Sequence, residues 1–99
     1  MNSLWIKDLA IGEVAYVGCG NREYKIWKSG VKMFSVTGGW CKDDEYVFDD
    51  MWSINYSAGV SVRNKIIVGC NFRFDLWDNG GYIIENDPVI SIEVKPDGN

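Results

Sequence analysis

Short runs of alternating apolar and polar residues, separated by Gly, Asn and Asp, fill most of this chain. Alternation with a period of two is typical of strands with one buried face, and the intervening residue types are those that turns favour. The pattern therefore predicts strands at residues 14–17, 23–27, 31–36, 45–48, 59–63, 65–69, 72–77, 82–85 and 89–95.

The clearest hairpin signal joins residues 72–77 to residues 82–85. The intervening Asp78-Asn79-Gly80-Gly81 contains Asn-Gly, which supplies the positive φ values that tight hairpin turns require. Helical periodicity is weak, so only residues 3–9 and 49–53 are predicted as short helical turns. Residues 37–44 are predicted to form a loop.

The length of 99 residues suits one domain, which we expect to span residues 1–99. A mostly β chain of this size forms a small antiparallel barrel or a sandwich, either of which hides most strand edges. We therefore predict one of these two architectures, with at most one or two short helical turns.

Two segments about 50 residues apart resemble each other, which suggests an internal repeat within residues 11–50 and 60–95. The matched positions begin with Val17-Gly18-Cys19 and Val68-Gly69-Cys70, and they continue to Trp27 and Trp77. Turn glycines and alternating aromatic residues are common to unrelated hairpins, whereas Cys and Trp at matched offsets are rare. Both interpretations, a repeat and a chance match, remain open.

A true repeat would place two β units about a pseudo-two-fold axis. Lys25 and Lys28 in the first unit would then correspond to Asp75 and Asp78 in the second. Opposite charges at equivalent positions would pair across the axis and fix the orientation of the units.

The charged residues indicate which partners to expect. Ten Lys and Arg residues stand against fourteen Asp and Glu residues, and the basic ones are scattered along the chain. Scattered basic residues argue against binding to nucleic acid, and no apolar run is long enough to span a membrane. We therefore expect neither nucleic acid nor a membrane as a partner. Three cysteines without a metal-binding spacing, and a start without a secretory pattern, predict a cytoplasmic protein with free thiols.

The inventory of reactive residues argues against catalysis. The chain has no histidine, which excludes imidazole acid–base chemistry and histidine metal ligands. The Gly-rich stretches at 18–20 and 38–39 lack the spacing of phosphate-binding loops, so we expect no cofactor. We predict that the protein is not an enzyme.

Two weaker alternatives remain for reactive groups. The acidic segment between Asp43 and Asp50 offers ligands for a hard cation, or carboxylates for a hydrolase, but a solvated loop is the favoured interpretation. Cys19 and Cys70 would form a disulfide if they met across the repeat axis, but two buried thiols are favoured.

Two tryptophans give the strongest functional signal. Alternation assigns Tyr24, Ile26, Phe72, Phe74 and Leu76 to the core, and Trp27 and Trp77 to the opposite, outward face. Charged residues accompany the two tryptophans in the sequence: Lys25, Lys28, Arg73, Asp75 and Asp78.

Tryptophan surrounded by charge is typical of interface hot spots. We therefore predict an interaction module that binds another protein or a second copy of itself, and we expect a homodimer. Binding of a small ligand or a carbohydrate on the aromatic faces is the alternative. A third interpretation is that other parts of the chain, such as residues 37–44, cover both rings.

Overall fold

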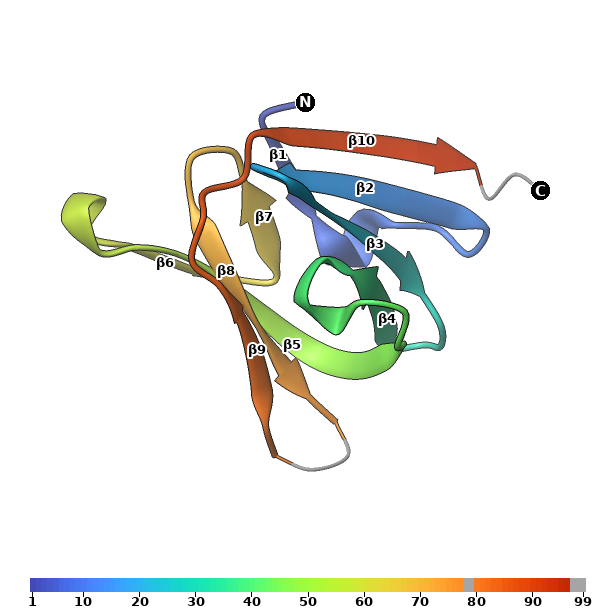
Figure 1. Cartoon of the computed structure of the whole chain (residues 1–99). Helices are drawn as coiled ribbons and strands as arrows, with labels where there is room; N and C mark the ends of the chain where they lie inside the picture. Colours follow the sequence, from blue (N-terminus) through green and yellow to red (C-terminus); the bar gives the residue numbers. More distant parts are fainter. Residues whose placement is uncertain (78–79, 97–99) are drawn as a thin grey trace.

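The computed structural model describes residues 1–77 and 80–96, and it confirms a mostly β fold (Figure 1). Three single-turn 3-10 helices interrupt the strands in the described residues. The strands are β1 (Ser3–Trp5), β2 (Glu13–Cys19), β3 (Arg22–Lys28), β4 (Phe34–Gly38), β5 (Tyr46–Asn55), β6 (Val60–Arg63), β7 (Lys65–Ile67), β8 (Asn71–Leu76), β9 (Tyr82–Glu85) and β10 (Ser91–Pro96). The 3-10 helices are η1 (Ile6–Asp8), η2 (Gly39–Cys41) and η3 (Tyr56–Ala58).

The main sheet has the strand order β10-β2-β3-β4-β5-β8-β9, and every pairing is antiparallel. β6 pairs with the last part of β5, and β1 and β7 form a separate two-stranded sheet. Figure 1 shows the main sheet bending so that β10–β2–β3 and β5–β8–β9 lie on different sides of the molecule. Within the described chain β9 and β10 do not pair, so the fold is sandwich-like rather than a closed barrel.

An aromatic cluster fills the space between the two parts of the sheet. Tyr24, Phe48, Phe72 and Phe74 are completely buried, and the ring centroids of Phe48 and Phe74 are 4.7 Å apart. The small β1–β7 sheet and η1 contribute further buried side chains to this core. The predicted assignment of the core face is therefore confirmed, with Leu76 only partly buried at its margin.

The helical turn predicted at residues 49–53 is wrong, because these residues lie inside the long strand β5. Phe48 and Met51 are both buried, and their three-residue spacing resembles a helical repeat. The pairing of β5 with β8 shifts register between Phe48 and Asp50. Such a β-bulge places an extra residue in the strand, so a helix-like spacing arises within extended chain.

Two other predicted elements need correction. Residues 31–33 belong to the turn after β3 rather than to a strand, because Ser29 N–H and Gly30 N–H both donate to the Met33 carbonyl. The short helical turn predicted within residues 3–9 is confirmed only at η1 (Ile6–Asp8), because the residues before it form β1. Local alternation does not reveal where such turns begin.

The predicted hairpin is confirmed in its strands, since β8 and β9 pair in antiparallel fashion. Asp78 and Asn79 of the predicted turn lie outside the described residues. The two segments of the proposed repeat differ in their pairing: β2 and β3 pair with each other, whereas β7 pairs with β1, and β8 pairs with β5 and β9. The repeat therefore stays a prediction.

Candidate interaction surface

Trp27 and Trp77 lie on the outer face of the sheet in one row, which runs from β3 across β4 and β5 to the residue that follows β8. The pairings align Trp27 with Ser35 and Ser35 with Val47, and Trp77 N–H donates to the Val47 carbonyl at 3.0 Å. Directly opposed residues of antiparallel strands project to the same face. With a strand spacing of about 4.8 Å, the path along the sheet between the two tryptophan backbones is about 14 Å. We call Trp27, Ser35, Val47 and Trp77 the tryptophan row.

The side chains of the row differ in exposure. Trp77 is 55% exposed, whereas Trp27 and Val47 are half-buried. Ser35 is buried although it faces outward, because it is small and stands between two larger neighbours. Its hydroxyl oxygen has no hydrogen-bond partner among the residues that the structure describes. The row is thus an apolar strip that covers a polar atom at its centre.

A hollow of about 500 Å³ lies beside Trp77. Val31, which is 88% exposed, and Met33 form the apolar part of its wall with Trp77. Its remaining lining residues are charged: Lys32, Asp49, Asp50 and Arg63. An exposed aromatic side chain therefore stands next to an exposed aliphatic one inside a charged rim.

A smaller hollow of about 290 Å³ adjoins Trp27 at the other end of the row. Val14, Tyr16, Lys25 and Thr37 complete its lining. Lys25 Nζ is 5.8 Å from the centroid of the Tyr16 ring, within the range of a weak cation–π contact. The predicted association of Lys25 with Trp27 on one outer face is consistent with this hollow.

Lys28 belongs to a third hollow, of about 230 Å³, at the β3–β4 turn. Lys7 and Lys32 also line it, so three lysines from distant parts of the chain gather there. None of the three forms an ion pair with another described residue. Asp49 and Asp50 line the same hollow, and Asp50 is already engaged by Arg63 at 2.7 Å.

Arg73 and Asp75 do not join the tryptophan row. Both lie on β8, where Arg73 Nε donates to Asp75 Oδ1 at 2.9 Å. Asp75 therefore forms its ion pair with Arg73, two residues away on the same strand, and not with Lys25 across a pseudo-two-fold axis. Asp78, the remaining predicted residue, lies outside the described part of the chain.

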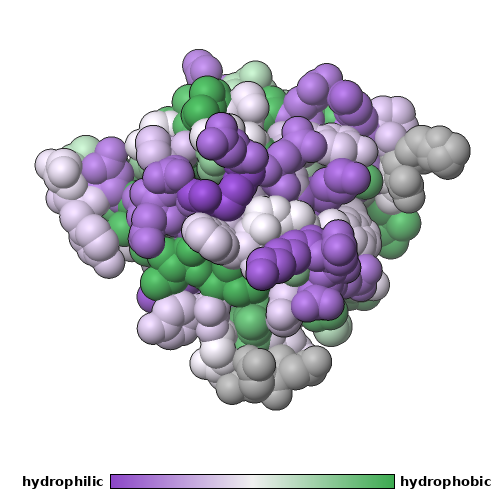
Figure 2. All heavy atoms as spheres, viewed as in Figure 1, coloured by the Kyte–Doolittle hydropathy of each residue, from purple (hydrophilic) through white to green (hydrophobic). Residues whose placement is uncertain are grey.

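Arg73 lies on the same outer face as Trp77, further back along β8, where it is flanked by β5 and β9. Its guanidinium lies 5.8 Å from the ring of Tyr82, which is 62% exposed, and Ile84 on β9 is also exposed. In Figure 2 hydrophobic side chains gather in the region where Figure 1 draws β8 and β9. In this part of the outer face Arg73 is already paired with Asp75, whereas the lysines near β4 form no ion pair with a described residue.

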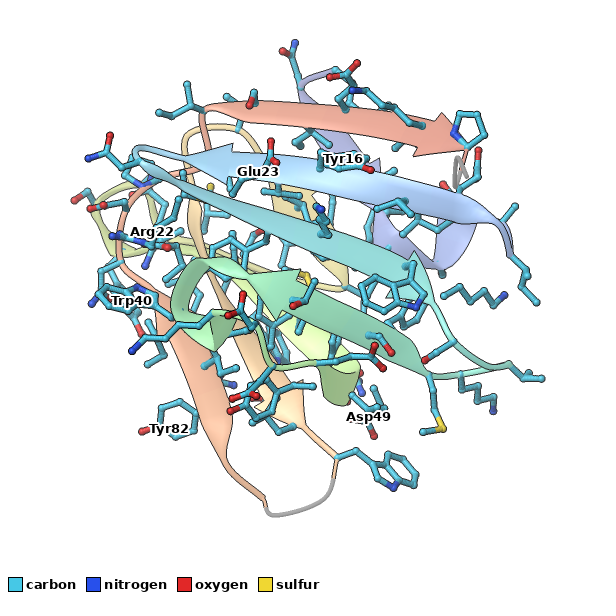
Figure 3. The ribbon with its side chains drawn as sticks, turned by 45° about the vertical axis from the view of Figure 1, so that its right-hand side comes forward. Tyr16, Arg22, Glu23, Trp40, Asp49 and Tyr82 are labelled. Carbon is cyan, nitrogen blue, oxygen red and sulfur yellow. The ribbon has the colours of Figure 1, made fainter. Side chains whose placement is uncertain are left out.

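Local sequence patterns do not predict the buried polar cluster around Glu85. Glu85 is completely buried, and it accepts hydrogen bonds from Arg22 Nε and Nη2, both at 2.7 Å, and from the backbone N–H of Asp87 at 3.0 Å. Arg22 also stacks over the Trp40 ring at 4.5 Å. Figure 3 shows Arg22 and Trp40 beside each other at one side of the molecule.

Burial alone would raise the pKa of Glu85, but the hydrogen bonds from Arg22, Asp87 and Tyr24 outweigh it, so the pKa lies below its usual range. The hydrogen bond to Glu85 is the largest cause of a raised pKa at Arg22. Both partners therefore remain charged at neutral pH. Both carboxylate oxygens of Glu85 are engaged, so this cluster stabilises the fold.

Three free cysteines, Cys19, Cys41 and Cys70, are all buried, which confirms the thiol interpretation over the disulfide. In the described residues, no group of three Cys, Asp or Glu side chains is placed to share a metal ion. The same residues include no helix with the length and apolar character needed to cross a membrane.

Comparison with known proteins adds no relative. No protein-family model matches the chain, and neither a curated protein nor a solved structure is significantly similar to it.

Proposed function

We propose that this chain is a non-enzymatic interaction module that binds protein through the tryptophan row. One observation carries the proposal: Trp27 and Trp77 lie on the same outer face, and Trp77 stands beside the exposed Val31 within a charged rim. An apolar centre with aromatic residues, surrounded by polar groups, is the composition of binding hot spots.

The state of the acidic residues supports a binding role over a hydrolytic one. Asp50 accepts hydrogen bonds from Arg63 Nε and Nη2 at 2.9 and 2.7 Å, and these bonds lower its pKa. A carboxylate held in its ionised form is a poor proton donor, which a glycoside-cleaving pair requires. With no histidine in the sequence, the module is proposed to act by contact alone.

We also propose a reducing compartment, the cytoplasm, as the place where the module acts. The support is that the three cysteines are buried, free thiols and that none of them is used in a disulfide. Small domains that work in oxidising surroundings usually rely on disulfides.

The test is a comparison of protein capture by three purified, folded forms: the wild type, Trp27→Ser/Trp77→Ser, and Tyr56→Ser. Tyr56→Ser is the control, because it removes an exposed aromatic ring from η3, outside the tryptophan row. Cross-linking followed by mass spectrometry should recover contacts at the row, either with a second copy or with another protein. The double variant should lose these contacts and the control should keep them. Unchanged contacts in the double variant would refute the proposal.

The 500 Å³ hollow beside Trp77 favours a second candidate function, the binding of a small ligand such as a sugar. Its volume lies in the range of ligand pockets, and an indole beside Asp49 and Arg63 combines a stacking face with hydrogen-bonding groups. A panel of mono- and oligosaccharides that quenches wild-type tryptophan fluorescence, but not that of Trp77→Phe, would support this candidate. No quenching across the panel would reject it for carbohydrates.

A further inference from the structure

We infer that the hollow of about 230 Å³ at the β3–β4 turn is a binding site for the phosphate group of a small phosphorylated molecule. Three lysines line it, and none of them forms an ion pair with another described residue. We call this cavity, with Lys7, Lys28 and Lys32, the lysine hollow. It is separate from the tryptophan row, because no residue of the row lines it.

Three parts of the backbone position the lysines. Lys28 ends β3 and pairs in register with the buried Phe34, which also lines the hollow, so Lys28 lies toward the core side of the sheet. Lys32 belongs to the turn that follows, and two hydrogen bonds to the Met33 carbonyl, at 3.0 and 3.2 Å, close this turn. Lys7 comes from η1. The lysine hollow is therefore built by a strand end, a closed turn and a 3-10 helix, rather than by one loop.

The carboxylates at the lysine hollow leave an excess of positive charge. Arg63 Nη2 is 2.7 Å from Asp50 Oδ2, and Asn64 Nδ2 donates to Asp50 Oδ1 at 3.3 Å, so the charge of Asp50 is already compensated. Asp49 is the other carboxylate in the lining. Three ammonium groups therefore stand against one uncompensated carboxylate, which leaves a charge of about +2 at neutral pH. A phosphate monoester carries about −1.5 to −2 at the same pH, so its charge matches that of the hollow.

The surroundings of the lysines do not neutralise them. Lys7 Nζ lies 5.8 Å from the centroid of the Trp5 ring, and Lys65 Nζ lies 4.7 Å from the same centroid. Such cation–π contacts hold an ammonium group in place and leave its charge available to an anion. Lys28 is half-buried without a counter-ion among the described residues. Since a partly buried charge is unfavourable without a partner, an anion bound in the hollow would be stabilised there.

The size of the lysine hollow and its neighbour indicate the class of ligand. At about 230 Å³ the hollow is smaller than the pockets that enclose whole drug-sized molecules, so it suits one charged group of a ligand. It shares Val31, Lys32, Asp49 and Asp50 with the 500 Å³ hollow beside Trp77. A sugar phosphate would therefore place its phosphate among the lysines and its ring toward Trp77. The position of the ring rests on the second candidate function above, whereas the phosphate site does not depend on it.

The test is a phosphorus NMR titration of ribose 5-phosphate and of inorganic phosphate with the protein, at constant pH and about 0.15 M salt, with ribose as a competitor. Lys28→Ala/Lys32→Ala removes two of the three ammonium groups, and its urea midpoint should stay near that of the wild type because neither lysine forms an ion pair. This variant should bind ribose 5-phosphate about tenfold or more weakly, because each charged hydrogen bond contributes strongly. Lys7→Ala is an independent variant of the same hollow and should also weaken binding. Lys42→Ala/Lys95→Ala is the matched control, with the same loss of charge at exposed lysines that do not line the hollow.

Binding of ribose 5-phosphate by the wild type and the control, with loss of affinity in both lysine-hollow variants and no displacement by ribose, supports the phosphate site. Absence of binding of both phosphate probes at millimolar concentration overturns it, and so does equal weakening in the control, which would show a general effect of net charge. Equal affinity for inorganic phosphate and ribose 5-phosphate, both lost in Lys28→Ala/Lys32→Ala, would support the phosphate site and count against a sugar ring beside Trp77. Trp27→Ser/Trp77→Ser should keep its affinity for inorganic phosphate, so that failure of the tryptophan row as an interaction surface is distinguishable from failure of the phosphate site.

Discussion

Tyr24 and Glu85 are 61 residues apart in the sequence, yet the Tyr24 hydroxyl donates to Glu85 Oε1 at 2.8 Å in the buried interior. The same hydroxyl oxygen accepts the backbone N–H of Trp40 at 3.2 Å. Together with Arg22, this chain of bonds connects η2 with β3 and β9, two strands that are not neighbours in the sheet. It therefore holds the two parts of the bent sheet together.

We predict that Glu85→Ala lowers the free energy of unfolding by about 3 kcal/mol, because it leaves Arg22, the Tyr24 hydroxyl and the Asp87 N–H without their common acceptor. Urea denaturation followed by circular dichroism measures the change. Glu93→Ala is the control. Glu93 is exposed, and its ion pair with Lys95 is weak because the two charged atoms are 3.7 Å apart in solvent, so its removal should cost less than about 0.5 kcal/mol. Equal losses in the two variants would contradict the structural role of Glu85.

The lowered pKa of Glu85 predicts a dependence of stability on pH. An unfolded glutamate titrates near pH 4.3, and the folded state titrates lower because of Arg22. The unfolded state then binds more protons than the folded state in this range, so the contribution of Glu85 is complete above about pH 4.3 and is lost as the pH falls through the folded pKa. Melting temperatures between pH 7 and pH 3 should fall more steeply for the wild type than for Glu85→Gln. Parallel curves would show that Glu85 does not titrate as the structure requires.

Period-two alternation was enough to predict most strands and the inward face of β3 and β8. It works because each of these strands has one face on the aromatic core and one face outside. The pattern fails at β5. The bulge between Phe48 and Asp50 shifts the alternation by one residue, so that Met51 rather than Asp50 is the next residue on the buried face. A bulge is set by pairing with a second strand, and the sequence of β5 alone does not contain that information.

The position of Trp27 and Trp77 was predictable only in part. Alternation indicates that each faces outward, but their common row depends on the order β3-β4-β5-β8, which no local pattern specifies. Glu85 is the opposite case. In the sequence it is an ordinary polar residue at the end of a strand. Its burial is favourable only because Arg22, on another strand, forms an ion pair with it.

We predict that Gly39→Ala is more destabilising than an ordinary glycine substitution. Gly39 has φ +49°, and a Cβ atom there would overlap the ring of Tyr24, which is itself fixed by its bond to Glu85. Backbone strain and overpacking together should lower the free energy of unfolding by about 2–4 kcal/mol. Gly59→Ala is the matched control: Gly59 has φ +69° with open space around it, so only the backbone cost of about 1 kcal/mol applies. Similar urea midpoints for the two variants would show that the ring moves aside without cost.

The buried cysteines predict slow modification of the native protein. Burial is the largest cause of a raised pKa at both Cys19, which reaches about 12, and Cys41, which reaches about 11. The carboxylate of Glu85 raises the pKa of Cys19 further. Since the thiolate is the reactive form, a shift from 9.0 to about 12 lowers its fraction at pH 8 roughly a thousandfold.

Iodoacetamide at pH 8, with the labelled peptides identified by mass spectrometry, measures this protection at each cysteine. Cys19 should stay unmodified over a period in which all three cysteines react completely in a denaturing concentration of urea. Glu85→Ala should speed the labelling of Cys19, because the weakened cluster opens more often and exposes the thiol. Rapid labelling of Cys19 in the native wild type would contradict its burial. Equal labelling rates in the wild type and Glu85→Ala would show that the Glu85 cluster does not protect Cys19.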